Sequence, residues 1–323
     1  SGTSNTIFGY ASGANIASGG DKNTLYGKST GYSISTGDNN TNLGWEAGYY
    51  NATGSNNTAV GSGSMMGASG QSNSNNTAVG YDTLKLITTG ASNVAVGAYA
   101  GDSITTGQDN ITIGLYAGAN LTTQDEMVFV GHQAGIAVNN DNSDGMVAVG
   151  YQAGYVATIN QQYSTFVGKQ AGHNVLDSEK STFIGNYTGA LLGGDAADNN
   201  TFIGVSAGAS GSYTANDNTA NNNIGIGCSA LGGQAGAGSA YNFTATHNIA
   251  IGNDTLKVVT SGRNNVVLGS TAGDALTTGS NNVAVGQGAL GAENTGSANV
   301  AIGQLALRDL TGGYTNNTAV GYR

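Results

Sequence analysis

A five-residue pattern of polar and apolar positions recurs along the whole chain. In its clearest copy, Asn76 to Gly80, a polar residue is followed by a β-branched residue, a small residue, an apolar residue and a glycine. Most copies follow one another at intervals of 17 to 19 residues. A fixed period of this length predicts a stacked array in which each repeat forms one coil. The eighteen copies end at Gly9, Gly27, Gly44, Gly61, Gly80, Gly97, Gly114, Gly131, Gly150, Gly168, Gly185, Gly204, Gly227, Gly252, Gly269, Gly286, Gly303 and Gly321.

The three residues before each repeat glycine predict a short β-strand. The first is Thr, Val or Ile in every copy, and the third is apolar or aromatic, as in Thr77 and Val79 or in Val94 and Val96. Residues two apart on a strand share one face. We therefore expect these two columns to fill the inside of the coil, with Gly80 and Gly97 ending their strands.

The middle residue of each predicted strand points to the opposite face and is also mostly apolar. Its bulkiest examples are Phe129, Phe166, Phe183 and Phe202. A strand with two apolar faces needs cover on both, and no helical period in the chain could supply it. We therefore expect other copies of the same chain to cover these phenylalanines, in a homotrimer around a central axis.

A second constant segment follows each repeat glycine. Seven residues after the glycine there is commonly another apolar side chain, as at Ile87, Ile104 and Leu276. The coil then closes with Thr-Thr-Gly or a relative, where glycine permits a tight turn. Each coil is thus expected to contain strand, turn, second short strand and turn. The asparagine that begins most copies, such as Asn76, is expected to hydrogen-bond from coil to coil.

These patterns predict an all-β fold, a parallel β-solenoid (β-roll) of about 18 coils that forms a single repetitive domain over residues 1–323. The absence of proline agrees with this prediction, because a proline in an interior strand deletes a ladder hydrogen bond. Two segments rich in small and polar residues, 209–222 and 232–247, break the period. We expect them to bulge from neighbouring coils, where a recognition loop would lie.

Charge and cysteine content argue against several classes of function. The net charge is −10, from 19 acidic and 9 basic residues, whereas nucleic acids and anionic membranes need clustered Lys and Arg. Cys228 is the only cysteine, so neither an internal disulfide nor a cysteine zinc site is expected. No apolar run approaches the roughly 18 residues needed to span a bilayer, so membrane insertion is not expected.

No set of side chains predicts catalysis, a cofactor or a metal site. His132, His173 and His247 fall far apart in the expected stack, whereas a hydrolase needs its catalytic groups together. The acidic pairs fall in turns, where solvated turn residues are the simpler interpretation. These pairs are Asp125 with Glu126, Asp141 with Asp144, Asp177 with Glu179 and Asp195 with Asp198. A calcium site at Asp141, Asn142 and Asp144 would lack the glycine-aspartate nonapeptide of calcium-binding β-rolls.

Aromatic residues supply the candidate ligand contacts. Tyr99, Tyr116 and Tyr187 come two residues after their repeat glycines, and Trp45 directly follows Gly44. Exposed aromatic side chains on a rigid solenoid can stack on sugar rings. The alternative, which we favour, is an aromatic ladder that covers the turns.

The unit Asn-Asn-Thr-Ala-Val-Gly, followed by Ala-Gly or Ala-Leu and closed by Thr-Thr-Gly, resembles the repeats of phage tail-fibre proteins. It is also similar to the head repeats of trimeric autotransporter adhesins, which use a comparable Asn-x-Ala-Ile/Val-Gly motif. The resemblance covers the whole chain. It implies a left-handed, trimeric parallel β-roll with a shaft or adhesive function, located outside the cell, on its surface or on a virion.

We therefore expect a non-catalytic structural fibre protein that needs no cofactor. It would act as a trimeric shaft or as a filament whose subunits stack head to tail, with a role in surface attachment. Two alternatives remain open. One is an adhesin module that binds host-surface or environmental glycans, and the other is a polysaccharide depolymerase that uses turn carboxylates.

Overall fold

The computed structural model describes residues 2–139, 143–156, 161–190, 192, 197–209, 219–232 and 243–323. It contains eighteen strands of three residues each and, within these ranges, no helix. Two compact units, Ser1–Tyr155 with strands β1 to β9 and Val156–Arg323 with β10 to β18, are described separately. The strands are β1 (Thr6–Phe8), β2 (Thr24–Tyr26), β3 (Thr41–Leu43), β4 (Thr58–Val60), β5 (Thr77–Val79), β6 (Val94–Val96), β7 (Ile111–Ile113), β8 (Val128–Val130), β9 (Val147–Val149), β10 (Thr165–Val167), β11 (Thr182–Ile184), β12 (Thr201–Ile203), β13 (Ile224–Ile226), β14 (Ile249–Ile251), β15 (Val266–Leu268), β16 (Val283–Val285), β17 (Val300–Ile302) and β18 (Thr318–Val320).

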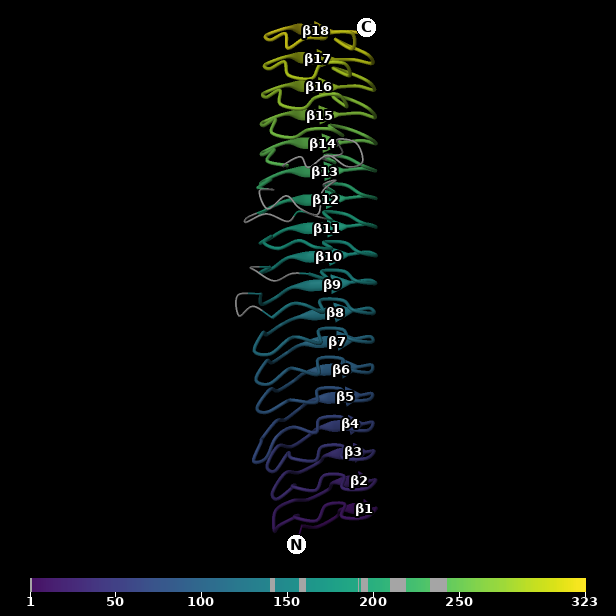
Figure 1. Cartoon of the computed structure of the whole chain (residues 1–323), viewed down its shortest axis with the longest axis vertical. Coiled ribbons are helices and arrows are strands. Elements are labelled where there is room, and N and C mark those ends of the chain that lie inside the picture. The colour runs from purple at the N-terminus through teal and green to yellow at the C-terminus, as the bar shows by residue number, and fades with distance from the viewer. Residues whose placement is uncertain are drawn as a thin grey trace. The chain divides into compact units, whose positions relative to one another are not determined.

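Each unit is a β-solenoid in which consecutive strands pair in parallel. Equivalent residues of neighbouring coils are in register, so that Val94 pairs with Ile111 and Ala95 with Thr112. Figure 1 shows the strands of each unit stacked one above the next, one strand to a coil. The predicted all-β parallel solenoid is thereby confirmed. That residues 1–323 form a single domain stays a prediction. The two irregular segments, 209–222 and 232–247, lie largely outside the described residues.

The side of the strand that faces the coil interior is opposite to the one expected. In β6, Ala95 is completely buried, whereas Val94 and Val96 are each 36% exposed. The same alternation holds along both units, with the middle residue inside and its two neighbours outside. The prediction that the β-branched columns fill the coil is wrong. A three-residue strand directs one side chain inward, and β-branched residues fit the outer face of a sheet equally well.

Two further columns complete the interior. The small residue three positions after the repeat glycine is buried, as at Ala100 and Ala272, and so is the apolar residue seven positions after it, as at Ile104 and Leu276. The segment that carries them is not a second strand, as was expected, but a succession of turns. Its residues include left-handed conformations, such as Tyr99 with φ of +56°. Extended pairing is impossible at such a residue, and over the described residues each coil has one strand.

Side-chain size is balanced across the narrow interior. Phe183 faces Gly189, where a β-carbon would lie 2.5 Å from the Phe183 ring. Phe129, Phe166 and Phe202 face Gly135, Gly172 and Gly208 in the same way. Where the middle strand residue is alanine, a leucine often takes the glycine's place, as with Ala78 and Leu84, both completely buried. In these coils, one large side chain therefore fills the space, and it comes either from the strand or from the turn that faces the strand.

A buried column of asparagines joins the coils, as the sequence predicted. The Asn93 backbone N–H and side-chain amide donate to Asn76 Oδ1 at 2.9 and 3.1 Å. The same side-chain amide donates to the Gly107 carbonyl at 2.9 Å. Each of these asparagines thus bonds to the asparagine of the preceding coil and satisfies buried backbone groups of the following coil, which sets the register between coils.

Polar side chains also compensate for changes in coil length. Thr105, Thr106 and Gly107 donate their N–H groups to the Thr122 carbonyl of the next coil. Before the longer coil that ends at Gly321, the corresponding N–H groups of Asn294, Thr295 and Gly296 donate to Oε1 of the buried Glu293 instead, at 2.8–3.0 Å. Gln124 Oε1 accepts from Thr122 and Thr123 in a similar position. A side-chain oxygen thus replaces the main-chain carbonyl that the longer coil moves away.

Candidate functional site

Each unit exposes a regular surface that consists of the first and third residues of its strands, which we call the outer sheet face. These positions hold only Thr, Val, Ile, Leu, Phe and Tyr, and none of the eighteen strands carries a charged residue. Because neighbouring strands are in register, the side chains form two straight columns along each unit. Its exposed members include Val79, Val94, Val96, Ile111 and Ile113 in the first unit and Ile184, Ile224, Ile251 and Ile302 in the second.

An apolar surface of this kind is unusual for a monomeric protein in water. Isolated apolar residues on a surface need no explanation, but an uninterrupted apolar column beside a column of Thr, Val and Ile, neither with a charge, does. At the start of the first unit the column of third residues ends in two aromatic side chains, where the Phe8 and Tyr26 rings stack at 4.9 Å. The outer sheet face therefore has the composition of an interface.

The four phenylalanines predicted at the subunit interface lie elsewhere. Phe129, Phe166, Phe183 and Phe202 are completely buried within the single chain. The rings of Phe166, Phe183 and Phe202 stack on one another inside the second unit, with centroids 5.1 and 5.3 Å apart. They are unavailable to a partner, so the prediction is wrong for these residues. The reason is the reversed orientation of the strands.

The predicted ligand contacts do not form one cluster. Tyr99 and Tyr116 stack at 4.9 Å, and Tyr81 meets Tyr99 edge to face at 5.3 Å. This is the aromatic ladder of the alternative interpretation, and burial together with the adjacent Tyr81 raises the pKa of Tyr99. Tyr187 is exposed in the other unit, and Trp45 is 52% exposed in the first. Whether any of them contacts a sugar stays a prediction.

Members of the predicted histidine and acidic sets contact residues of neighbouring coils. The His132 ring lies 5.4 Å from the Tyr151 ring, and burial lowers the pKa of His173. Asp144 accepts a hydrogen bond from the Asp125 N–H at 2.9 Å, which is a turn contact. Asp141 and Asp195 lie outside the described residues. Over the described part of the chain, no group of three metal-ligating side chains occurs, and no helix is long and apolar enough to cross a membrane.

A charged motif that the sequence reasoning missed occurs once in each unit. The sequence Asp-Thr-Leu-Lys at 82–85 and again at 254–257 places an ion pair on a turn, with Lys85 2.8 Å from Asp82 and Lys257 3.0 Å from Asp254. An aspartate follows in the next coil, Asp102 in the first case and Asp274 in the second. Burial raises the pKa of both carboxyl groups. The identical tetrapeptide was the available signal.

Comparison with known proteins adds no further constraint, since no protein-family model, curated protein or solved structure matches the chain.

Proposed function

We propose that the protein is a non-catalytic structural component of an extracellular or virion-borne fibre, assembled from three copies that pack through their outer sheet faces. The observation that carries this proposal is the pair of uncharged columns on each unit, one of apolar and aromatic side chains and one of threonine and β-branched apolar side chains. A solenoid that buries its own core has no folding reason to keep such columns exposed to water. The outer sheet face of another copy of the chain would remove these columns from water.

The size of the face supports association between copies. Nine strands spaced by about 4.8 Å, each about 10 Å long, give a face of roughly 430 Å² per unit. A standard protein interface buries roughly 800 Å² per partner, so the faces of both units are needed to supply it. A second copy of this chain also presents the same spacing between coils, so the side chains of two faces can interdigitate along their whole length.

The choice of three copies and of a left-handed coil rests on the resemblance to tail-fibre and trimeric-adhesin repeats. Three copies around one axis form a closed ring of identical contacts, whereas an additional head-to-tail contact would extend the assembly into a filament. A stiff, feebly charged solenoid is suited to a shaft that holds an attachment site away from a surface.

Charged substitutions on the outer sheet face are expected to dissociate the assembly without unfolding the chain. Val96→Asp together with Ile302→Asp introduces one carboxylate into the face of each unit, and both side chains point away from the core. In an interface each would be buried without a partner. Light scattering should report single chains, and circular dichroism should be unchanged.

The matched control is Thr106→Asp, an exposed turn residue outside the strands. This variant should keep the wild-type mass. If the double variant also keeps it, the outer sheet face is not the interface and the proposed assembly is wrong.

A further inference from the structure

A hollow of about 550 Å³ opens on the turn surface of the second unit, and we call it the notch. Two glycines of one coil create it, because Gly288 and Gly291 provide no side chain where the coils on either side do. The preceding coil has Thr271 and Asp274 at these positions, and the following coil has Leu305 and Arg308. The notch is thus a one-coil gap in two columns of side chains.

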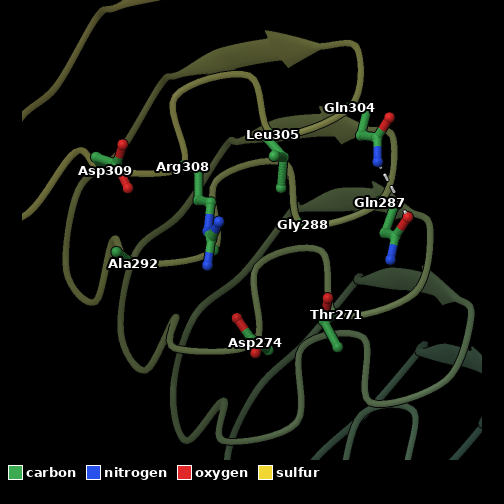
Figure 2. Close-up of a pocket in the computed structure, with 10 residues that line it drawn as sticks. Thr271, Asp274, Gln287, Gly288, Ala292, Gln304, Leu305, Arg308 and Asp309 are labelled. Carbon is green, nitrogen blue, oxygen red and sulfur yellow. Dashed lines mark hydrogen bonds between the residues drawn. The ribbon is translucent and has the colours of Figure 1, made fainter. Parts of the chain in front are cut away.

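Opposite charges stand on the two sides of this gap. Figure 2 shows Arg308 and Asp274 directed toward one another across the coil that contains Gly288 and Ala292. In the described part of the chain the Arg308 guanidinium has no ion-pair partner, since the adjacent Asp309 is paired with Arg323 at 3.2 Å. Gln304 donates to Gln287 Oε1 at 3.3 Å along a third side.

The first unit provides an internal comparison. Asp102 follows its Asp-Thr-Leu-Lys motif as Asp274 follows the second one, yet the next coil carries Tyr116 and Ala119 in place of Gly288 and Gly291. Tyr116 stacks on Tyr99 there. Ile136 occupies the position of Arg308. The gap and its cation are therefore specific to the second unit, although the two units share the aspartate and the fold around it.

We propose that the notch binds a monosaccharide that carries a carboxylate, of the hexuronate class. Arg308 would hold the carboxylate through a bidentate pair, which its planar guanidinium favours. Asp274 and Thr271 on the opposite side and Gln287 on the third side present acceptors and donors for sugar hydroxyls. Leu305 offers an apolar surface for the C–H face of the ring. The volume lies within the roughly 300–1,000 Å³ of ordinary small-molecule sites.

This proposal goes beyond the fibre function and does not depend on it. The residues that line the notch belong to turns, whereas the proposed interface consists of strand residues. Failure of one proposal therefore leaves the other intact.

The test is a titration of the wild-type chain with glucuronate, in which binding is measured by calorimetry or by protein-observed NMR. Saturable binding is expected, with glucose, which lacks the carboxylate, at least about tenfold weaker. Arg308→Ala should weaken glucuronate binding at least about tenfold, and Arg308→Lys should do so less because a lysine keeps the charge but loses the paired geometry. Gly288→Tyr, which copies Tyr116 of the first unit, should abolish binding by filling the notch.

Arg263→Ala, which removes an exposed arginine of the same unit outside the notch, should bind like the wild type. Unchanged circular dichroism would show that all variants are folded. The proposal is overturned by the absence of saturable glucuronate binding, by equal binding of glucose, or by binding that persists in Arg308→Ala. Tighter binding of a zwitterionic amino acid than of glucuronate would also contradict the sugar assignment.

Discussion

Replacing Gly97 with alanine is expected to destabilise the first unit by about 3 kcal/mol or more. Gly97 has φ of +128°, and a β-carbon on it would lie 2.7 Å from the carbonyl oxygen and 2.8 Å from the carbonyl carbon of Gly114. Both atoms belong to the backbone of the next coil, which cannot move without breaking the register of the stack. Urea unfolding followed by circular dichroism measures the effect.

Gly321→Ala is the matched control for this experiment. Gly321 occupies the same position of the repeat with φ of +137°, but nothing lies within 4 Å of its ideal β-carbon. The Gly321→Ala variant therefore has the same cost of placing alanine in this backbone conformation, but it has no clash with a neighbouring coil. If the two variants are equally stable, close approach between coils does not explain the repeat glycine.

The second large effect is expected at Phe183, where Phe183→Ala should cost about 3–5 kcal/mol. The ring is completely buried and stacks between Phe166 and Phe202. Its removal leaves a cavity that the opposite side of the coil cannot fill, because Gly189 has no side chain. Thermal or urea unfolding of the chain measures the loss.

A second substitution on the opposite side of the coil should restore part of this stability. Phe183→Ala combined with Gly189→Leu recreates the Ala78 and Leu84 pair of the first unit. Leu84 tolerates the left-handed conformation there, with φ of +48°. If Gly189→Leu destabilises Phe183→Ala further, the two positions do not share one interior space.

The strands themselves could be predicted from the sequence almost residue by residue. Each of the eighteen strands ends directly before a repeat glycine, and the asparagine column forms the predicted hydrogen bonds between coils. Both features depend on local rules, since glycine alone accepts the conformation after the strand and asparagine supplies a donor and an acceptor to the backbone. The repeat period and these local rules are therefore sufficient to predict the strand ends and the asparagine hydrogen bonds.

The inward face could not be read from the strand residues alone. Val94, Ala95 and Val96 are all apolar, so alternation of polar and apolar residues, the usual signal for the buried face, is absent. The information lies instead in pairs of residues six positions apart. A phenylalanine in the strand, as at Phe183, goes with a glycine at Gly189, and an alanine such as Ala78 goes with Leu84. That reciprocity in size identifies the middle column as the interior.

The notch depends on residues that are distant in the sequence. Asp274 and Arg308 face one another because the coil between them is one repeat long, which places them at equivalent positions. That coil has glycine at positions 288 and 291, so no side chain fills the space between them. Asp125 and Glu126 are adjacent in the sequence and are visible there as an acidic pair, whereas Asp274 and Arg308 are separated by two repeats. Alignment of successive coils places Asp274, Gly291 and Arg308 at equivalent positions, which is the sequence signal for the notch.

The central claim is that the outer sheet face joins copies of this chain, and the mass of the wild-type protein in solution tests it most directly. Light scattering should give three times the chain mass of 32.0 kDa, or a larger assembly if the subunits also join end to end. A stable single chain at concentrations used for structural work would contradict the account, because the apolar side chains of the outer sheet face would then remain exposed to water.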